Sequence, residues 1–223
     1  MITVHHLENS QSIRILWLLE ELGVEYSLKH YNREPETSLA PKDFKTLHIT
    51  GTSPLISDGD RLLPETNAII DYVLDKYQDK TLRPSCNSPL RTDYLYWFHA
   101  SQGSFMPLLT SALVFNRLKT RVPFFLKPLM KLIIGRVESM FLQPRINSFL
   151  TQIEQQLAKG PWFAGEQFTA ADIVMGYCMQ VAEVRVGMDD RYPNAHAFLK
   201  RMEMRPGYQQ ALIKNGNFQP LKG

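Results

Sequence analysis

Residues 51–66, which read GTSPLISDGDRLLPET, constrain the fold of this chain more than any other segment. Pro54 precedes a short apolar run, and proline is tolerated in sheets chiefly at first positions and edges, where no backbone N–H is needed. Asp58-Gly59 is a dipeptide that favours a tight hairpin between this run and the next one. The segment therefore predicts an edge strand followed by a hairpin.

The two residues after the hairpin, Glu65 and Thr66, stand at the head of a stretch with helical periodicity. Free backbone N–H groups and the helix dipole favour a carboxylate at such a helix start, and Glu65 can meet an ammonium there. Ser53 keeps a backbone N–H and C=O that can pair with an extended peptide as an added strand. These groups suit a small zwitterionic peptide, although similar hairpins and helix starts occur in many α/β domains that bind no ligand.

A second strand and helix are predicted at the beginning of the chain. Residues 2–4 are rich in β-branched side chains, and apolar residues then repeat at helical spacing from Ile13 to Gly23, a natural residue for a helix end. Ser10 and Ser12 precede this helix, where serine is most simply an N-cap. Only one of them can be the cap, so the other hydroxyl remains at the positive helix end and can donate to an anion.

The order of strand, helix, loop, proline, hairpin and helix is that of a thioredoxin-like domain, and the residues that fill it resemble the glutathione transferase superfamily. The similarity covers nearly the whole chain. Residues 123–131, which are rich in Pro and Phe, resemble a segment of the bacterial and fungal branch of the family. The motifs that carry it are Ser10 and Ser12, Gly51-Thr52-Ser53-Pro54, Glu65-Thr66, and residues 96–99, 103–107, 123–131, 161–165, 169–172 and 205–208.

This resemblance implies an α/β thioredoxin-like N-terminal domain and an all-α C-terminal helical domain. We expect the first domain at residues 1–80, a linker at 81–89 and the helical domain at 90–223. Charge agrees with such a boundary, because residues 1–80 hold 8 Lys and Arg against 13 Asp and Glu, whereas the remainder holds 17 against 9. The linker is rich in Pro, Ser and Asn, as boundaries often are.

The resemblance also implies an enzyme that uses glutathione as a co-substrate and conjugates its thiolate to electrophilic hydrophobic compounds. Ser10 is the first choice for the group that activates the thiol, because it matches the first serine of the family motif. Asn9 and Ser12 are rivals, since both lie within two residues of it. Peroxidase, isomerase or dehalogenase activity at the same site, or non-catalytic binding, are the alternatives.

By the same resemblance, glutathione binds at Thr52, Ser53, Pro54, Glu65 and Thr66. Ser53 would hold the cysteinyl backbone across a cis turn, and Glu65 and Thr66 the γ-glutamyl end. Thr52 replaces the usual lysine, so weaker binding of the glycine carboxylate is expected. A second substrate would face three residues spaced four apart on one helix of the second domain: Phe105, Leu109 and Leu113.

Residues 94–137 contain no acid, and basic residues alternate with apolar ones between 117 and 136. Charges recur too often there for a helix that crosses a bilayer. We expect the apolar side to pack on the helical bundle or to cover the substrate cleft. Peripheral contact with an anionic membrane is the alternative.

The remaining signals concern stability, assembly and location. Thr169 and Asp172 form a T-x-x-D capping box, which predicts a structural role. No metal site or nucleic-acid partner is predicted, and the sparse cysteines and the lack of a secretory signal favour the cytoplasm. The charge difference between the two domains and the family resemblance predict a homodimer, with Tyr94 and Trp97 as interface residues.

Overall fold

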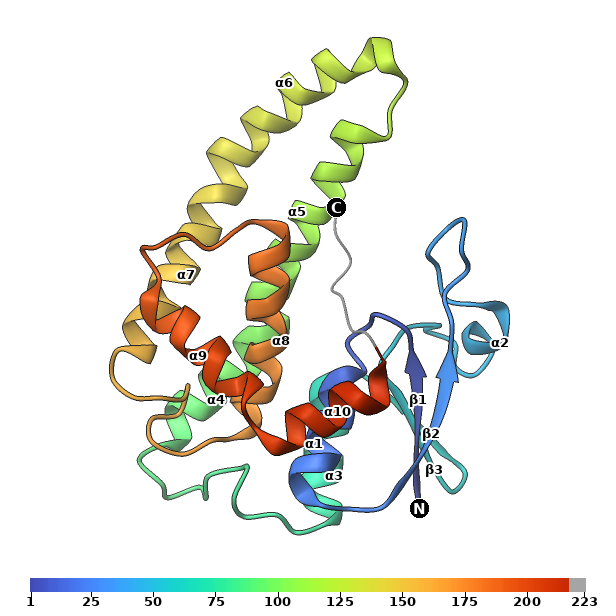
Figure 1. Cartoon of the computed structure of the whole chain (residues 1–223), viewed down its shortest axis with the longest axis vertical. Coiled ribbons are helices and arrows are strands. Elements are labelled where there is room, and N and C mark those ends of the chain that lie inside the picture. Colours follow the sequence, from blue (N-terminus) through green and yellow to red (C-terminus); the bar gives the residue numbers. More distant parts are fainter. Residues whose placement is uncertain (217–223) are drawn as a thin grey trace.

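The computed structural model describes residues 1–216 and contains a four-stranded mixed sheet in its N-terminal part (Figure 1). The strands lie in the order β2-β1-β3-β4; β1 pairs in parallel with β2 and antiparallel with β3, and β3 pairs antiparallel with β4. The hairpin predicted at Asp58-Gly59 joins β3 to β4, with Gly59 at φ 60°. The strands are β1 (Ile2–Leu7), β2 (Tyr26–Tyr31), β3 (Leu55–Asp58) and β4 (Arg61–Pro64).

Helices cover both faces of this sheet, as expected for a thioredoxin-like domain (Figure 1). Helices α1 (Ile13–Leu22) and α3 (Thr66–Lys76) pack on one face, and the short α2 (Lys42–Lys45) packs on the other through Phe44. Residues 13–19 of α1 are all buried, because the sheet covers one side of this helix and the C-terminal helices the other. The predicted helix end is confirmed at Gly23, which has φ 62°.

The rest of the described chain is helical, which confirms the predicted all-α second domain. Five-residue π-helical turns join α4 to α5 and α6 to α7, and the first of them contains Gly103. The helices are α4 (Arg91–Ala100), α5 (Met106–Thr120), α6 (Lys127–Val137), α7 (Gln143–Leu157), α8 (Ala170–Arg185), α9 (Pro193–Glu203) and α10 (Pro206–Asn215), with short turns η1 (Ser101–Phe105), η2 (Phe124–Leu126) and η3 (Glu138–Leu142).

The predicted capping box lies at the start of α8. The carboxylate of Asp172 is fully buried and accepts hydrogen bonds from the backbone N–H groups of Phe163 and Thr169, both at 2.7 Å. Burial raises the pKa of Asp172 to about 7, while these hydrogen bonds favour its ionised form. Asp172 therefore fixes the start of a core helix and ties it to the preceding loop.

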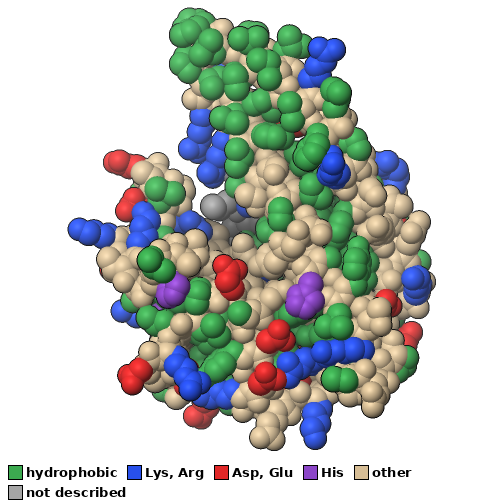
Figure 2. Space-filling model, turned by 180° about the vertical axis from the view of Figure 1, so that it is seen from behind, with side chains coloured by type: hydrophobic (Ala, Val, Ile, Leu, Met, Phe, Trp, Pro, Cys, Tyr) green, Lys and Arg blue, Asp and Glu red, His purple; other side chains and the backbone are tan. Residues whose placement is uncertain are grey.

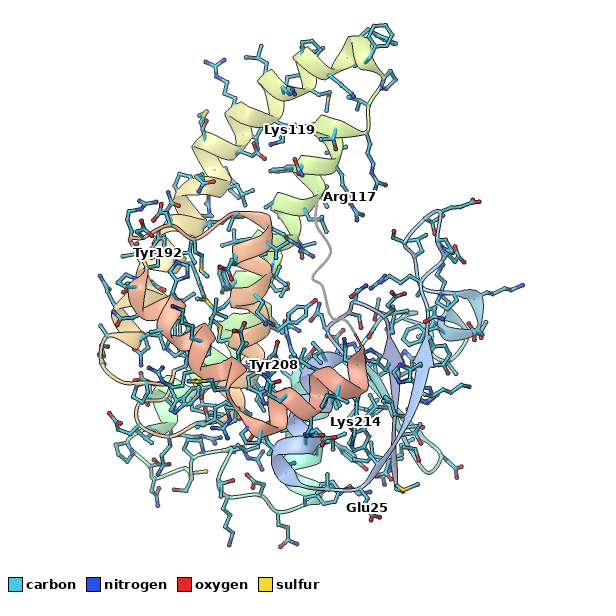
Figure 3. All side chains as sticks on the ribbon, in the orientation of Figure 1. Glu25, Arg117, Lys119, Tyr192, Tyr208 and Lys214 are labelled. Atoms are coloured by element: carbon cyan, nitrogen blue, oxygen red, sulfur yellow. The ribbon has the colours of Figure 1, made fainter. Side chains whose placement is uncertain are left out.

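The last helix fastens the two parts of the molecule together. Arg205 pairs with Glu21 of α1 at 2.6 Å, and Lys214 donates to Glu20 at 2.6 Å, so α10 lies along α1 (Figure 3). Gly207 allows the close approach, because a Cβ at this position would lie 2.7 Å from the Cδ of Glu21. The contact between α1 and α10 holds the N-terminal domain against the helical one.

Helices α5 and α6 form an arm that projects beyond the rest of the molecule (Figure 1). The sequence predicts that the apolar side of residues 117–136 packs on the bundle or covers the substrate cleft, and exposure contradicts packing on the bundle for most of its apolar residues. Phe124 is 83% exposed and Leu132 is 69% exposed, whereas Ile134 is the buried residue of α6. Among residues 1–216, no helix combines the length and apolar character needed to cross a membrane.

Two residues of α4 that the sequence predicts at a dimer interface are buried instead. The sequence predicts Tyr94 and Trp97 as interface residues, but both are buried within the chain, with 1% and 3% exposed. Tyr94 stacks on Phe98, and Trp97 packs against Phe163. The two predicted residues lie on the inward face of α4, so they stabilise the monomer core and offer little surface to a partner.

Candidate functional site

A cavity of about 320 Å³ lies where the loop after β1 meets the segment before β3 and the helix α8. Four of the predicted site residues line it, namely Asn9, Ser10, Thr52 and Ser53. Segments far apart in the sequence supply the rest. These residues are Leu7, Gln11, Arg33, Leu39, Ala40, Lys45, Gly51, Tyr177 and Arg185.

A chain of hydrogen-bonded side chains runs from this cavity into the core. The Oγ atoms of Ser53 and Ser10 lie 2.8 Å apart, those of Ser10 and Ser12 also 2.8 Å apart, and the Oγ of Ser12 lies 2.8 Å from Nδ1 of His6. Ser12 has no exposed surface, whereas Ser10 lines the cavity and is 5% exposed. Ser10 is therefore the serine of the pair that can reach a bound ligand.

The imidazole of His6 ends this chain in the core. Burial, with a smaller contribution from His30, lowers the pKa of His6 to about 4, so the ring is neutral near pH 7 and carries one N–H. Its Nε2 is buried without a partner among residues 1–216. An unpaired buried acceptor is more readily tolerated than an unpaired N–H donor, so the proton is favoured on Nδ1.

This tautomer determines which atom donates in each hydrogen bond between His6, Ser12, Ser10 and Ser53. If Nδ1 of His6 donates to Ser12, the Ser12 hydroxyl can donate to Ser10, and the Ser10 hydroxyl then points its own proton toward the cavity or Ser53. Successive hydrogen bonds of this kind polarise one another. The arrangement suits stabilisation of an anion that lies in the cavity beside Ser10.

Asn9 occupies the same loop in a left-handed conformation, with φ 49°. Arg33 holds this loop from the other side, because it donates to the backbone carbonyl of Glu8 at 2.8 Å and to that of Ser38 at 2.8 Å. Arg33 is not among the residues predicted from the sequence. It lies beyond β2, outside any local motif, and no signal in the sequence links it to the loop after β1.

The predicted residues at the start of α3, Glu65 and Thr66, do not line the cavity. Glu65 is exposed and has φ 75°, which costs a residue other than glycine of order 1–3 kcal/mol and is often found at functional sites. The buried Thr66 donates to Oε1 of Gln11 at 3.5 Å, and the same oxygen accepts a hydrogen bond from Gln102 at 2.8 Å. Gln11, also not predicted from the sequence, thus links the cavity to α3 and to the second domain.

Thr52 and Pro54 occupy the turn that precedes β3. Thr52 is exposed at the cavity, and the Ser53–Pro54 peptide bond is cis. Lys45 of α2 lies beside this turn, with its Cγ 3.5 Å from where a Cβ of Gly51 would be, and lines the same cavity. A cation is therefore present near position 52 although Thr52 itself carries none.

The three residues predicted for a second substrate do not lie together in the cavity. Phe105 and Leu109 have no exposed surface, and Phe105 stacks on Phe149 at 4.7 Å. Their helical spacing reflects the core of the second domain, so the expectation is corrected for these two. Leu113 is partly exposed, one helical turn farther along the arm.

Metal ligands are not grouped in the described part of the chain. Within residues 1–216, no three His, Cys, Asp or Glu side chains are placed to hold a metal ion. His5, adjacent to His6, bonds instead to the hydroxyls of Tyr31 and Ser57, each at 3.1 Å.

Comparisons with known proteins find relatives that cover nearly the whole chain. The family model described as glutathione S-transferase, N-terminal domain, matches residues 1–75, and that of the C-terminal domain matches residues 135–212. The chain is 32% identical to glutathione S-transferase 3 of Schizosaccharomyces pombe, over 96% of this chain and 88% of that protein. It is 25% identical to glutathione S-transferase 1 of Saccharomyces cerevisiae, over 93% of this chain and 92% of that protein. A solved glutathione S-transferase structure from Actinobacillus pleuropneumoniae is 32% identical with a TM-score of 0.79, over 96% of this chain and 93% of that one.

Proposed function

Because this chain belongs to the glutathione S-transferase family, we propose that it joins the sulfur of glutathione to electrophilic hydrophobic compounds. The Ser10 hydroxyl carries this proposal. It lines the cavity, lies 2.8 Å from Ser53 and is backed by the hydrogen-bonded pair of Ser12 and His6. A thiolate bound within reach of this hydroxyl would receive a hydrogen bond from a donor that is already oriented.

Glutathione fits the polar groups around this cavity. Ser53 offers its backbone to the cysteinyl unit beside Pro54, while the free N–H groups at the start of α3 attract the γ-glutamyl carboxylate. Glu65 would accept a hydrogen bond from the ammonium of the same unit. Lys45 lines the same cavity beside Gly51 and would supply a positive charge for the glycine carboxylate, so we expect less loss of affinity than Thr52 alone implies.

The chemistry requires the thiol to be ionised. A free thiol with a pKa of about 8.5 is only about 7% thiolate near pH 7.4. A hydrogen bond to a charged group contributes roughly 1.5–3 kcal/mol, which lowers the pKa by about 1–2 units. The sulfur then attacks an electrophilic carbon, a carbon–sulfur bond forms, the leaving group departs with its electron pair, and the thiol proton passes to solvent.

Calorimetry with glutathione and a conjugation assay with a chlorodinitrobenzene test this function. We expect heat of binding at millimolar glutathione or below, and release of chloride as the thioether forms. A folded sample that shows no heat would contradict glutathione binding. Binding without conjugation would instead favour the alternatives, and a panel of hydroperoxides, isomerisable substrates and haloalkanes would then separate a peroxidase, an isomerase or a dehalogenase from a non-catalytic binder.

We also propose a two-fold symmetric homodimer. The acidic first domain of one subunit can face the basic second domain of the other, twice, in such a pairing. The exposed Leu95 and Tyr96 on α4 replace Tyr94 and Trp97 as candidate interface residues. Surface charges contribute little affinity, so we expect an apolar contact that moderate salt does not dissociate. Sedimentation at micromolar concentration checks this, and a single species near 25.7 kDa would refute it.

A cytoplasmic location remains a prediction from the sequence.

A further inference from the structure

The end of the arm presents an unusual concentration of exposed apolar side chains. We define the arm tip as residues 121–133, which contain the η2 turn and the first half of α6. Phe124 is 83% exposed, Phe125 66%, Leu129 53% and Leu132 69%. Figure 2 shows the hydrophobic surface gathered at the end of the arm. Scattered exposed apolar residues are ordinary, but a contiguous patch marks a contact surface.

Packing among residues 1–216 does not account for these exposed side chains. The buried residue of α6 is Ile134, and η2 contains none. The rings of Phe124 and Phe125 pack edge to face, with their centroids 5.7 Å apart. Pro123 and Pro128 flank the turn and restrict the backbone there.

The charges around the patch have one sign. Arg121, Lys127 and Lys131 are exposed at the tip, and none of them forms an ion pair with any of residues 1–216. Residues 94–137 contain no Asp or Glu. The nearest acid after this stretch, Glu138, lies outside the arm tip and is paired with Lys119 at 2.8 Å. The apolar patch therefore lies in a field of uncompensated positive charge.

We propose that the arm tip docks on a bilayer surface that carries anionic headgroups, with Phe124 and Phe125 inserted at the boundary between headgroups and acyl chains. A basic surface with aromatic side chains is the combination that binds such an interface. The arm projects beyond the rest of the molecule, so a flat partner can meet the tip first (Figure 1).

A second copy of the chain that meets the patch tip to tip is a poorer occupant. A two-fold contact through the tip would bring Arg121, Lys127 and Lys131 of one copy against the same cations of the other. No acid within the tip could offset that repulsion, because residues 121–133 contain none. An anionic bilayer offers complementary charge and an apolar layer at once. This docking is independent of glutathione binding.

Vesicle flotation with the full chain tests the docking. The vesicles are phosphatidylcholine alone, or phosphatidylcholine mixed with phosphatidylglycerol at roughly two to one. We expect binding to the mixed vesicles, weaker binding to phosphatidylcholine alone, and a decrease when added salt screens the charges. The double variant Phe124→Ser/Phe125→Ser should lower the partition coefficient by roughly tenfold or more, because two large apolar groups are lost.

Two further variants separate the contributions. Lys127→Gln/Lys131→Gln should reduce binding to the mixed vesicles and leave the weak binding to phosphatidylcholine unchanged. Ile213→Ser is the matched control, since Ile213 is 72% exposed on α10, away from the arm, and should bind as the unmodified chain does. Circular dichroism establishes that each variant is folded.

Three results would overturn the proposal. The first is a failure of the unmodified chain to bind either kind of vesicle. The second is equal binding by the unmodified chain and the Phe124→Ser/Phe125→Ser variant. The third is a dimer that this variant converts to a monomer in sedimentation, which would assign the tip to a second copy of the chain. Glutathione binding measured on the same samples reports separately on the proposed function.

Discussion

Replacing Ser10 by alanine is expected to raise the pKa of bound glutathione by about one unit or more. The variant removes the proposed charge-assisted hydrogen bond to the thiolate, which would be worth roughly 1.5–3 kcal/mol, and 1.36 kcal/mol corresponds to one pKa unit. The fraction of thiolate at neutral pH should fall accordingly, and with it the rate of conjugation. Titration of the thiolate absorbance in the ultraviolet, with glutathione bound, measures the shift directly.

Ser12→Ala and Asn9→Ala are the matched comparisons. Ser12 has no exposed surface and acts on a ligand only through Ser10, so its removal should give a smaller shift in the same direction. Asn9→Ala tests the other candidate for thiol activation, which also lines the cavity. An unchanged titration curve for Ser10→Ala, together with a shifted curve for either comparison, would reassign thiol activation to that residue.

Features that depend only on residues close together in the sequence could be predicted from it. The Asp58-Gly59 hairpin, the helix end at Gly23 and the capping box at Thr169 and Asp172 each depend on residues close to one another. Turn chemistry and helix capping act over a few residues, so the sequence displays them directly. The family resemblance then supplied how these pieces are ordered into two domains.

Tertiary contacts explain most of what the sequence did not reveal. Arg33 and Lys45 reach the cavity from elements beyond the loop that holds Ser10, and no local pattern marks them. The helical spacing of Phe105 and Leu109 is identical for a core face and for a substrate pocket, and burial decides in favour of the core. Apolar content alone could not show that Phe124 lies outside the core, because this depends on where the arm points.

Replacing Glu65 by glutamine is expected to weaken glutathione binding by about tenfold or more. Glutamine keeps the size of the side chain and removes the charge that we propose to face the ligand ammonium. A hydrogen bond to a charged group contributes roughly 1.5–3 kcal/mol, and each 1.4 kcal/mol is a factor of ten in Kd. Because Glu65 is exposed, the substitution should leave the fold intact. Asp60→Asn, an exposed charge removed on the neighbouring hairpin, is the matched control.

A glutathione derivative acetylated at its amine identifies the partner of Glu65. Calorimetry of both proteins with both ligands forms a double-mutant cycle, which isolates the interaction between the carboxylate and the ammonium. Acetylation should weaken binding to the unmodified chain by about the same factor as Glu65→Gln does, and should change binding to the variant much less. Equal losses in the two proteins would show that Glu65 does not meet the ammonium. In that case the left-handed backbone at Glu65, with φ 75°, would serve to place the start of α3 for the carboxylate alone.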